Sequence, residues 1–324
     1  MRHSDDMARL VSVILSLLSL AGCDSDTPAL RLGTSAGWPG YEPVYLARDL
    51  GYLDPDRVRV VDYSSSTPLQ NDFAQGVIEA ATLTLDESLR LIPRRPDFRI
   101  VLLLDESRGA DALLSRPQFS TMAMLKGRRV GAEASGVGTF LLSRALEKSG
   151  MLPDEIETVA LRFDEHERAF TQGDVDAVVT FEPVKTRLTS AGAVVLFDSS
   201  QVPGEILDVL VVRQDVALAR SSEVRVMISA WFRALAYMRK NEGQSRARVA
   251  RRLGVPEERL GAVWGGLQMG DEQMNSRALK ERRIEKALAS NADIMNRNGL
   301  LHVTPDKDLV SLQMLGDVLG ESPR

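Results

Sequence analysis

Short apolar runs alternate with amphipathic segments between Leu30 and Val212. Apolar runs bounded by glycine or polar turn residues predict strands, and segments with helical periodicity predict helices. The predicted strands are Leu30–Thr34, Arg57–Tyr63, Ile78–Leu83, Phe98–Leu104, Ala112–Leu114, Arg129–Ala132, Ile156–Arg162, Val175–Thr180, Ala193–Phe197 and Glu205–Val212. Predicted helices such as Glu42–Leu50 and Thr67–Gln75 separate most of the strands, and the segment from Ser221 to about Asn298 is helical by pattern. This alternation predicts an α/β fold with mostly parallel sheets flanked by helices, followed by a helical C-terminal region.

Part of this pattern occurs twice along the chain. Three pairs of similar segments keep a nearly constant offset: Phe73–Ala80 with Phe170–Ala177, Arg31–Gly33 with Arg129–Gly131, and Gly51–Leu53 with Gly150–Leu152. The constant register predicts two similar α/β units in tandem. The alternative is a chance match between short strings rich in glycine and alanine.

Two such units predict two lobes joined by two crossovers of the chain. We expect residues 30–114 and 205–324 to form lobe 1, and residues 115–204 to form lobe 2. The crossovers would then act as hinges, since a few residues between two rigid bodies absorb their relative motion. The cleft between the lobes is the expected place for a small ligand.

The composition is typical of a soluble globular protein and excludes several functions. The chain of 324 residues has a net charge of −5, which makes nucleic acid an unsuitable partner. Its three histidines and single cysteine have no spacing suited to a structural metal. We therefore expect no metal and no cofactor.

The N-terminus has the features of a bacterial lipoprotein leader. Arg9 precedes the apolar run Leu10–Leu20, which is too short to cross a bilayer comfortably and is typical of a signal peptide. The following Ala21-Gly22-Cys23 resembles the lipobox, in which the cysteine is lipidated and becomes the mature N-terminus. We expect residues 1–22 to be a signal peptide and residues 23–29 a tether. A non-lipidated signal peptide or an N-terminal anchor is the alternative.

Several motifs resemble those of the substrate-binding proteins of nitrate/taurine-type (NitT/TauT) ABC importers. They are Trp38-x-Gly40-Tyr41-x-Pro43, Leu46-Ala47 with Gly51-Tyr52-Leu53, Leu125–Gly131, Gly173-x-Val175-Asp176-Ala177, Glu182-Pro183 and Asp208-Val209-Leu210. The resemblance implies the two-lobed type II periplasmic-binding-protein fold. It also implies that one small solute is bound between the lobes and delivered to an ABC permease in the inner membrane. With Cys23 lipidated, the protein would stand at the periplasmic face of that membrane.

Candidate ligand-binding residues follow the predicted strands, because ligands of open α/β sheets lie beyond the carboxyl ends of the strands. Trp38 and Tyr41 follow the first strand and offer flat apolar faces, although Trp38 could instead cover the core of its own lobe. Predicted helices begin near Ser64 in the first unit and near Ser135, Gly136 and Thr139 in the second. The free backbone N–H groups at the start of a helix suit an anion. Ordinary helix capping is the alternative.

The remaining candidates are mostly acidic. They are Thr84 and Asp86, Phe181 and Glu182, Ser107 and Asp111 near the first crossover, and Asp208 near the second. A rim with more carboxylates than cations favours a ligand that carries an amine or several N–H donors over a bare anion. Each carboxylate could instead be a helix cap or a surface charge, and Arg108 could pair with Asp105 or Asp111.

These features predict a lipid-anchored solute-binding protein that captures a nitrogen-containing solute for an ABC importer. A binding subunit that reports ligand occupancy to a membrane sensor is the alternative. An enzyme is a third possibility, because the resemblance extends to a fungal pyrimidine synthase that needs a histidine, a lysine and an iron-binding cysteine cluster. We expect no enzymatic activity here, since the only cysteine is in the leader and no histidine falls on a predicted cleft loop.

Overall fold

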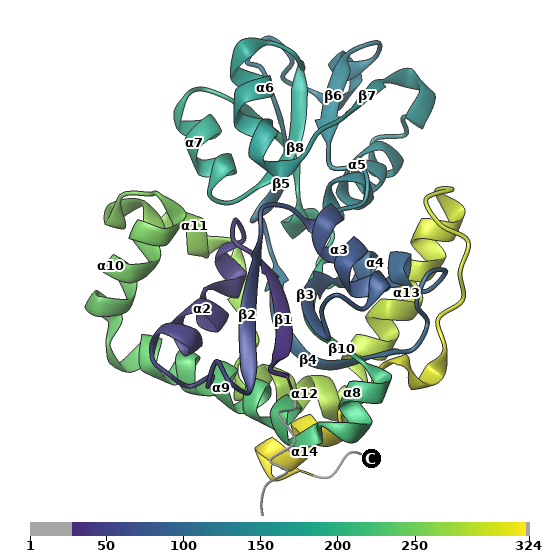
Figure 1. Cartoon of the computed structure of the whole chain (residues 1–324). Coiled ribbons are helices and arrows are strands. Elements are labelled where there is room, and N and C mark those ends of the chain that lie inside the picture. The colour runs from purple at the N-terminus through teal and green to yellow at the C-terminus, as the bar shows by residue number, and fades with distance from the viewer. Residues whose placement is uncertain (1–27, 322–324) are drawn as a thin grey trace, which may run out of the picture.

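The computed structural model describes residues 28–321. The predicted signal peptide, Cys23 and most of the predicted tether lie outside these residues. Within residues 28–321, no helix has both the length and the apolar character needed to cross a bilayer. The described chain forms two lobes, each built on one sheet (Figure 1).

The first sheet has six strands in the order β11-β4-β10-β3-β1-β2. Their bounds are β11 (Leu267–Met269), β4 (Phe98–Ser107), β10 (Leu207–Arg213), β3 (Ala80–Thr84), β1 (Leu30–Ser35) and β2 (Val58–Tyr63). The second sheet has five strands in the order β7-β6-β8-β5-β9. Their bounds are β7 (Glu157–Ala160), β6 (Arg129–Ala132), β8 (Ala177–Phe181), β5 (Asp111–Ser115) and β9 (Val194–Asp198).

The two sheets share one topology, as the repeated segments predict. The parallel trio β2-β1-β3 of the first sheet corresponds to the parallel trio β7-β6-β8 of the second. In each unit a helix ends at a glycine with positive φ before the third strand, at Gly76 (φ 77°) and at Gly173 (φ 88°). A residue with a β-carbon is strained in that left-handed conformation, which explains why both copies have glycine there.

The strands that follow the two crossovers are antiparallel to the strands beside them. β10 is antiparallel to β3 and β4, and β5 is antiparallel to β8 and β9. β5 pairs within the second sheet, so residues 111–114 lie in lobe 2 rather than in lobe 1, where the predicted boundary put them. Three residues, 108–110, connect β4 directly to β5. The sequence pattern located the strand but contained no information about which sheet it joins.

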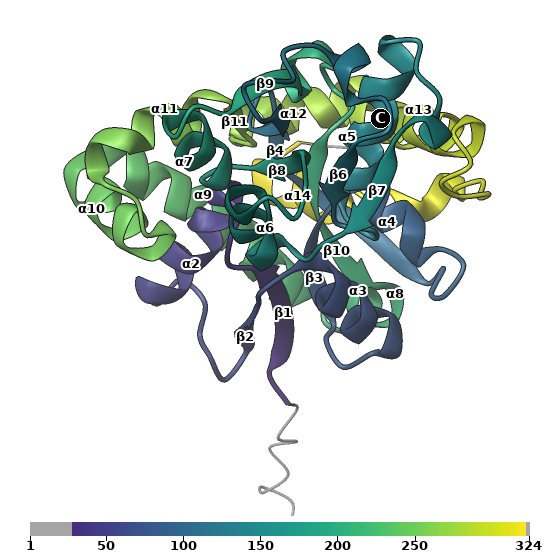
Figure 2. The same ribbon diagram turned by 90° about the horizontal axis from the view of Figure 1, so that it is seen from above.

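Helices cover both faces of the first sheet and surround the second (Figures 1 and 2). The α-helices up to the second crossover are α2 (Glu42–Asp49), α3 (Ser66–Gln75), α4 (Leu85–Leu91), α5 (Val137–Lys148), α6 (His166–Gln172) and α7 (Val184–Ser190). Those after it are α8 (Gln214–Ala219), α9 (Ser221–Lys240), α10 (Glu242–Leu253), α11 (Leu260–Gly265), α12 (Glu272–Glu281), α13 (Arg283–Arg297) and α14 (Gln313–Leu319). Short 3₁₀ turns, η1 (Pro39–Tyr41) and η4 (Phe163–Glu165) among them, lie near the cleft.

The C-terminal region is helical, as predicted, with one exception. β11 lies within the segment predicted to be entirely helical and pairs with the free edge of β4, from Leu267 opposite Ser107 to Met269 opposite Asp105. This pairing provides hydrogen bonds for backbone N–H and C=O groups that would otherwise be unpaired at the edge of the first sheet. Local sequence pattern does not reveal such a long-range pairing.

The lobes also touch away from the crossovers. α5 packs against β5 and β8 of its own lobe and contacts α4 of the first lobe. Buried apolar residues of both lobes, for example Leu85 and Phe140, belong to one continuous cluster. The structure therefore brings the carboxyl ends of β1 and β3 close to the second lobe, which is where the candidate residues lie.

Candidate ligand-binding site

A pocket lies between the two lobes. The space between its atoms, counted with its open mouth, is about 640 Å3, within the roughly 300–1,000 Å3 of small-molecule sites. Six of the thirteen candidate ligand-binding residues line it: Trp38, Tyr41, Thr84, Asp111, Phe181 and Asp208. The other lining residues are Ser35, Ser65, Ser66, Leu69, Thr82, Glu87, Glu133, Val137, Gly138, Phe163, His166, Val179 and Thr180.

Aromatic side chains from both lobes form one wall of the pocket. Trp38 of lobe 1 meets Phe181 of lobe 2 edge to face, with ring centroids 5.4 Å apart. Phe181 in turn stacks on Phe163, at 4.1 Å between centroids and 8° between ring planes. These rings provide a flat apolar surface that can hold a ring or a hydrocarbon body at little cost in conformational entropy.

Two buried carboxyl groups lie beside the aromatic wall, and one of them, Asp208, lines the pocket. Asp105 on β4 and Asp208 on β10 are opposite each other in the antiparallel register, and both are buried. Trp38 Nε1 donates a hydrogen bond of 3.2 Å to Asp105 Oδ2, and Tyr41 Oη donates to Asp208 Oδ1. A β-carbon at Gly40 would collide with Asp105 Oδ2, so glycine is needed there for Trp38 and Asp105 to meet.

The buried carboxyl groups of the pocket hold protons more tightly than ordinary ones. Burial raises the pKa of Asp111 to about 7 and that of Glu87 to about 8. Burial, followed by the nearby charge of Asp105, raises the pKa of Asp208 well above its usual range. Desolvation disfavours the charged form of each acid, and the acids also repel one another. The cluster therefore favours any partner that neutralises negative charge.

Cationic side chains do not provide that partner inside the pocket. Among the residues that the structure describes, no lysine or arginine lines the pocket. Asp111 Oδ2 is buried and accepts no hydrogen bond within residues 28–321, whereas Asp208 Oδ2 is buried beside the carboxyl group of Asp105. Buried carboxylate oxygens are usually paired, because leaving one unpaired costs about 1–3 kcal/mol.

His166 lines the pocket, which corrects the prediction that no histidine would face the cleft. It is the first residue of α6, and its Nδ1 lies 3.2 Å from Thr180 Oγ1. Burial lowers its pKa to about 4, so the imidazole is neutral near pH 7. Sequence reasoning missed it because the turn η4 and the start of α6 direct this side chain toward β8, which the pattern alone does not reveal.

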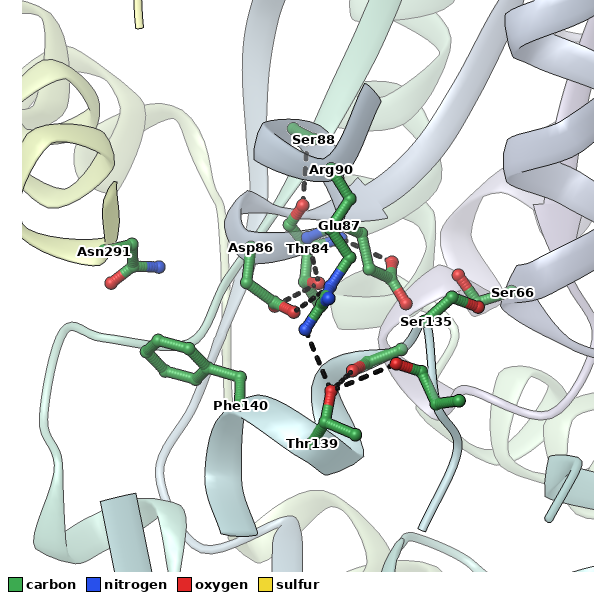
Figure 3. A network of polar contacts seen from close by, with 12 residues as sticks. Ser66, Thr84, Asp86, Glu87, Ser88, Arg90, Ser135, Thr139, Phe140 and Asn291 are labelled. Carbon is green, nitrogen blue, oxygen red and sulfur yellow. Dashed lines mark hydrogen bonds and ion pairs between the residues drawn. The ribbon is translucent and has the colours of Figure 1, made fainter. Parts of the chain in front are cut away.

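Asp86 and Thr139 do not line the pocket but lie beside a bridge between the lobes (Figure 3). Asp86 accepts a hydrogen bond of 2.7 Å from Thr84 and faces Arg90, with 3.9 Å between Oδ2 and Nε. Arg90 Nη2 then reaches across to Thr139 Oγ1 at 2.9 Å, at the start of α5. Asp86 and Thr139 therefore lie on the α4–α5 contact.

Ser107 and Glu182 also lie outside the lining and have structural partners. Ser107 Oγ lies 2.7 Å from Ser199 Oγ, which joins the first crossover to the second. Glu182 is buried and accepts a hydrogen bond of 3.1 Å from the backbone N–H of Thr186 in α7. Helix capping, the alternative that the sequence left open, accounts for its contact. Arg108 pairs with Glu106 at 3.1 Å, not with Asp105 or Asp111.

The remaining candidates are near the pocket without lining it. Ser64 is exposed, whereas Ser65 is the residue that precedes α3 and faces the pocket. Gly136 is the N-cap of α5, and Ser135 contacts Thr67 of the first lobe across the cleft. These loops border the pocket, and the residues that line it differ from the predicted ones by one or two positions.

Two acidic residues of the lining, Glu87 and Glu133, were absent from the prediction. A usable signal existed for Glu87: Thr84 and Glu87 have the spacing of a capping box, and the structure has both of its hydrogen bonds. That motif places Glu87 back at the strand end, toward the cleft. Glu133 directly follows the strand β6 and corresponds to Ser35 in the repeat. Its position after a strand was the only available signal.

Comparison with known proteins assigns the chain to a protein family. The model of the family described as "NMT1/THI5 like" matches residues 38–245, more than half of the chain. A curated relative, a putative aliphatic sulfonates-binding protein of Escherichia coli (strain K12), is 25% identical over 165 residues. That match covers 51% of this chain and 48% of the relative, so the chain spans about half the length of the curated relative.

Solved structures show the same fold at low sequence identity. The alkanesulfonate-binding protein SsuA of Xanthomonas axonopodis pv. citri, bound to MOPS, superposes with a TM-score of 0.74 at 19% identity, over 89% of this chain and 99% of that one. The desulfurization enzyme DszB superposes with a TM-score of 0.63 at 18% identity, over 90% and 99%. The predicted two-lobed periplasmic-binding-protein fold is thereby confirmed. The chain belongs to the NMT1/THI5-like family, in agreement with its NitT/TauT-type motifs.

Proposed function

We propose that the protein is an extracytoplasmic solute-binding protein that captures a small solute between its lobes and delivers it to an ABC importer. The sulfonate-binding names of its sequence relative and of a structural neighbour support a binding role. The leader with Cys23 supports attachment by lipid at the periplasmic face of the inner membrane. The permease of that importer would be its macromolecular partner.

The solute that fits best carries a cationic amine or several N–H donors on a flat or apolar body. One observation carries this proposal: the buried carboxyl groups of Asp111 and Asp208 face a pocket that no lysine or arginine lines within residues 28–321, and Asp111 Oδ2 accepts no hydrogen bond there. A charge-assisted hydrogen bond from an ammonium or amidine group would satisfy this oxygen. The rings of Trp38, Phe163 and Phe181 would hold the apolar body.

The solute would leave the site chemically unchanged. The pKa of His166, lowered by burial to about 4, makes this imidazole a weak general base near neutral pH. Aspartates with raised pKa values hold their protons and are poor nucleophiles in the ligand-free site. The names of the sulfonate-binding relative and neighbour support binding and release rather than turnover.

A thermal-shift panel with a matched pair of probes tests the ligand class. Benzylamine and benzenesulfonate share one ring and differ in the sign of the attached charge. We expect benzylamine, putrescine or an aminopyrimidine to raise the melting temperature of the purified protein at pH 8, and benzenesulfonate to leave it unchanged. Stabilisation by sulfonates and other oxyanions alone would contradict the proposed ligand class.

Native mass spectrometry of the protein purified from its own membrane identifies the bound solute without a prior guess. We expect a small nitrogen-containing molecule that has the same mass before and after incubation. A solute whose mass changes during incubation would indicate turnover and would overturn the binding-only role.

A further inference from the structure

Glu133, on the second lobe, lies at the N-terminus of a helix of the first lobe. It directly follows β6, and its side chain crosses the cleft to α3. Its Oε1 accepts a hydrogen bond of 3.1 Å from Thr67 Oγ1 and a longer one of 3.4 Å from the Thr67 backbone N–H. Ser65 and Ser66, which precede Thr67 at the start of α3, also lie near this carboxylate. The side chain is buried, with 6% of the residue exposed.

The N-terminus of a helix is a favourable place for an anion. The first N–H groups have no partner within the helix, and the helix dipole places partial positive charge there. In many proteins a phosphate, sulfate or carboxylate of a ligand occupies this position. Here the N-terminus of α3 lines the ligand pocket through Ser65 and Ser66, and the anion that occupies it is the protein's own Glu133.

The surroundings of Glu133 are adapted to this position. A β-carbon built at Gly136 would lie 3.2 Å from Glu133 Oε2, so a larger residue there would press on the carboxylate. Ser135 reinforces the contact, since its hydroxyl meets Thr67 Oγ1 and its carbonyl accepts a hydrogen bond of 2.9 Å from Gln70 Nε2.

We propose that Glu133 is a specificity-determining residue that takes the place of an anionic ligand group at α3 and thereby excludes sulfonates, phosphates and carboxylates from the pocket. The same contact joins the two lobes, so lobe closure does not depend on an anion from the ligand. The inference rests on the proposed function only in that the ligand occupies this pocket. It explains how a chain with the fold of a sulfonate-binding neighbour can select the opposite charge.

Removal of this carboxylate tests the proposal through a gain of binding. Glu133→Ala and Glu133→Ser both vacate the N-terminus of α3, because neither side chain is long enough to reach Thr67 and neither carries a charge. At pH 6, where Asp111 and Glu87 hold protons, we expect both variants to bind benzenesulfonate at least tenfold more tightly than the wild type in calorimetry. Glu133→Gln, which fills the same space, and Glu157→Ala, an exposed change in the same lobe, should behave as the wild type does.

The location of the gained site is tested by Glu133→Ala combined with Thr67→Val. The valine lacks the hydroxyl donor, so the double variant should bind benzenesulfonate less tightly than Glu133→Ala alone. Melting curves establish that each variant is folded, and Glu133→Ser decides the question if Glu133→Ala does not fold. Folded variants without any gain, or a wild type that already binds benzenesulfonate well, would overturn the role of Glu133.

These outcomes are distinguishable from failure of the proposed function. A wild type that binds benzylamine, together with Glu133 variants that gain no sulfonate, refutes only the role of Glu133. A wild type that ignores every amine, together with Glu133 variants that gain benzenesulfonate, refutes the amine ligand and supports the role of Glu133.

Discussion

Asp208 lies directly opposite Asp105 in the antiparallel ladder between β10 and β4, and both carboxyl groups are buried. Two negative charges at this separation repel each other strongly in a medium that excludes water. Protons neutralise the pair in the ligand-free protein, and a cationic ligand would neutralise it in the complex. The stability of the ligand-free protein should therefore fall as the pH rises, whereas its affinity for a cationic ligand should increase.

The ligand-free protein should lose stability as the pH rises from about 4 to about 8. Burial raises the pKa of Asp105 and Asp111 to about 7 and that of Glu87 to about 8, above the unfolded values near 4. The folded state therefore binds more protons than the unfolded state in this window, so stability falls as these protons are lost. Each group contributes a slope of up to about 1.4 kcal/mol per pH unit.

Urea unfolding at half-unit steps of pH measures this slope. Asp105→Asn should make the curve flatter, because the amide does not titrate and keeps the size of the carboxyl group. A free energy of unfolding that rises between pH 5 and pH 8 would show that the buried carboxyl groups do not have raised pKa values.

Amine binding should show the reverse dependence and should release protons. A cation stabilises the ionised carboxylates, so benzylamine affinity should rise from pH 5.5 to pH 8. Calorimetry in buffers of different ionisation enthalpy counts the protons released on binding, and we expect a value above zero near pH 7. Affinity that is constant with pH would argue against a cation in contact with Asp111 and Asp208.

Asp208→Asn should weaken amine binding by roughly 10- to 100-fold, since a charge-assisted hydrogen bond is replaced by a neutral one. Tyr41 Oη can still donate to the amide oxygen, so the fold should be retained. Asp56→Asn is a matched control, because Asp56 is exposed and remote from the pocket. Equal affinity of the Asp208 and Asp56 variants would remove Asp208 from the site.

Gly40→Ala should lower the free energy of unfolding by about 1–3 kcal/mol, because an added methyl group collides with Asp105 and forces local shifts. The indole of Trp38 should lose its hydrogen bond to Asp105, which a change in tryptophan fluorescence would report. Gly243→Ala is the control: it lies in α10 with open space around it, and alanine there should be neutral or stabilise by about 0.5–1 kcal/mol. Equal stability of the two variants would contradict the close approach at Gly40.

Arg90→Met should destabilise the protein by about 1–3 kcal/mol, because it leaves Asp86 buried without its cation and breaks the hydrogen bond to Thr139. Asp86→Asn in the same chain should recover part of this loss, and the double-mutant cycle measures the coupling between the two residues. Thr139→Val removes only the hydrogen bond across the lobes and should cost less than Arg90→Met. Additive effects of the Arg90 and Asp86 substitutions would show that the pair is not coupled.

The tandem repeat and the loops that carry the site could be predicted from the sequence. Glycine at positions 76 and 173, and the matching strands before and after each, are local features that report the duplicated α/β unit directly. The excess of carboxyl groups near the strand ends also indicated the character of the pocket. Each of these inferences depends on residues close together in the chain, where periodicity and turn chemistry act.

The identity of the lining residues depended on tertiary structure. Asp86 and Glu87 are neighbours in the chain, but successive residues of a helix point about 100° apart, so only Glu87 faces the pocket while Asp86 faces Arg90. The juxtaposition of Asp105 with Asp208 arises from the register of two strands far apart in sequence. Likewise, the contact of Glu133 with α3 exists only when the lobes meet. Sequence pattern determines which faces of each element are apolar, and the packing of distant elements decides which polar groups share a cavity.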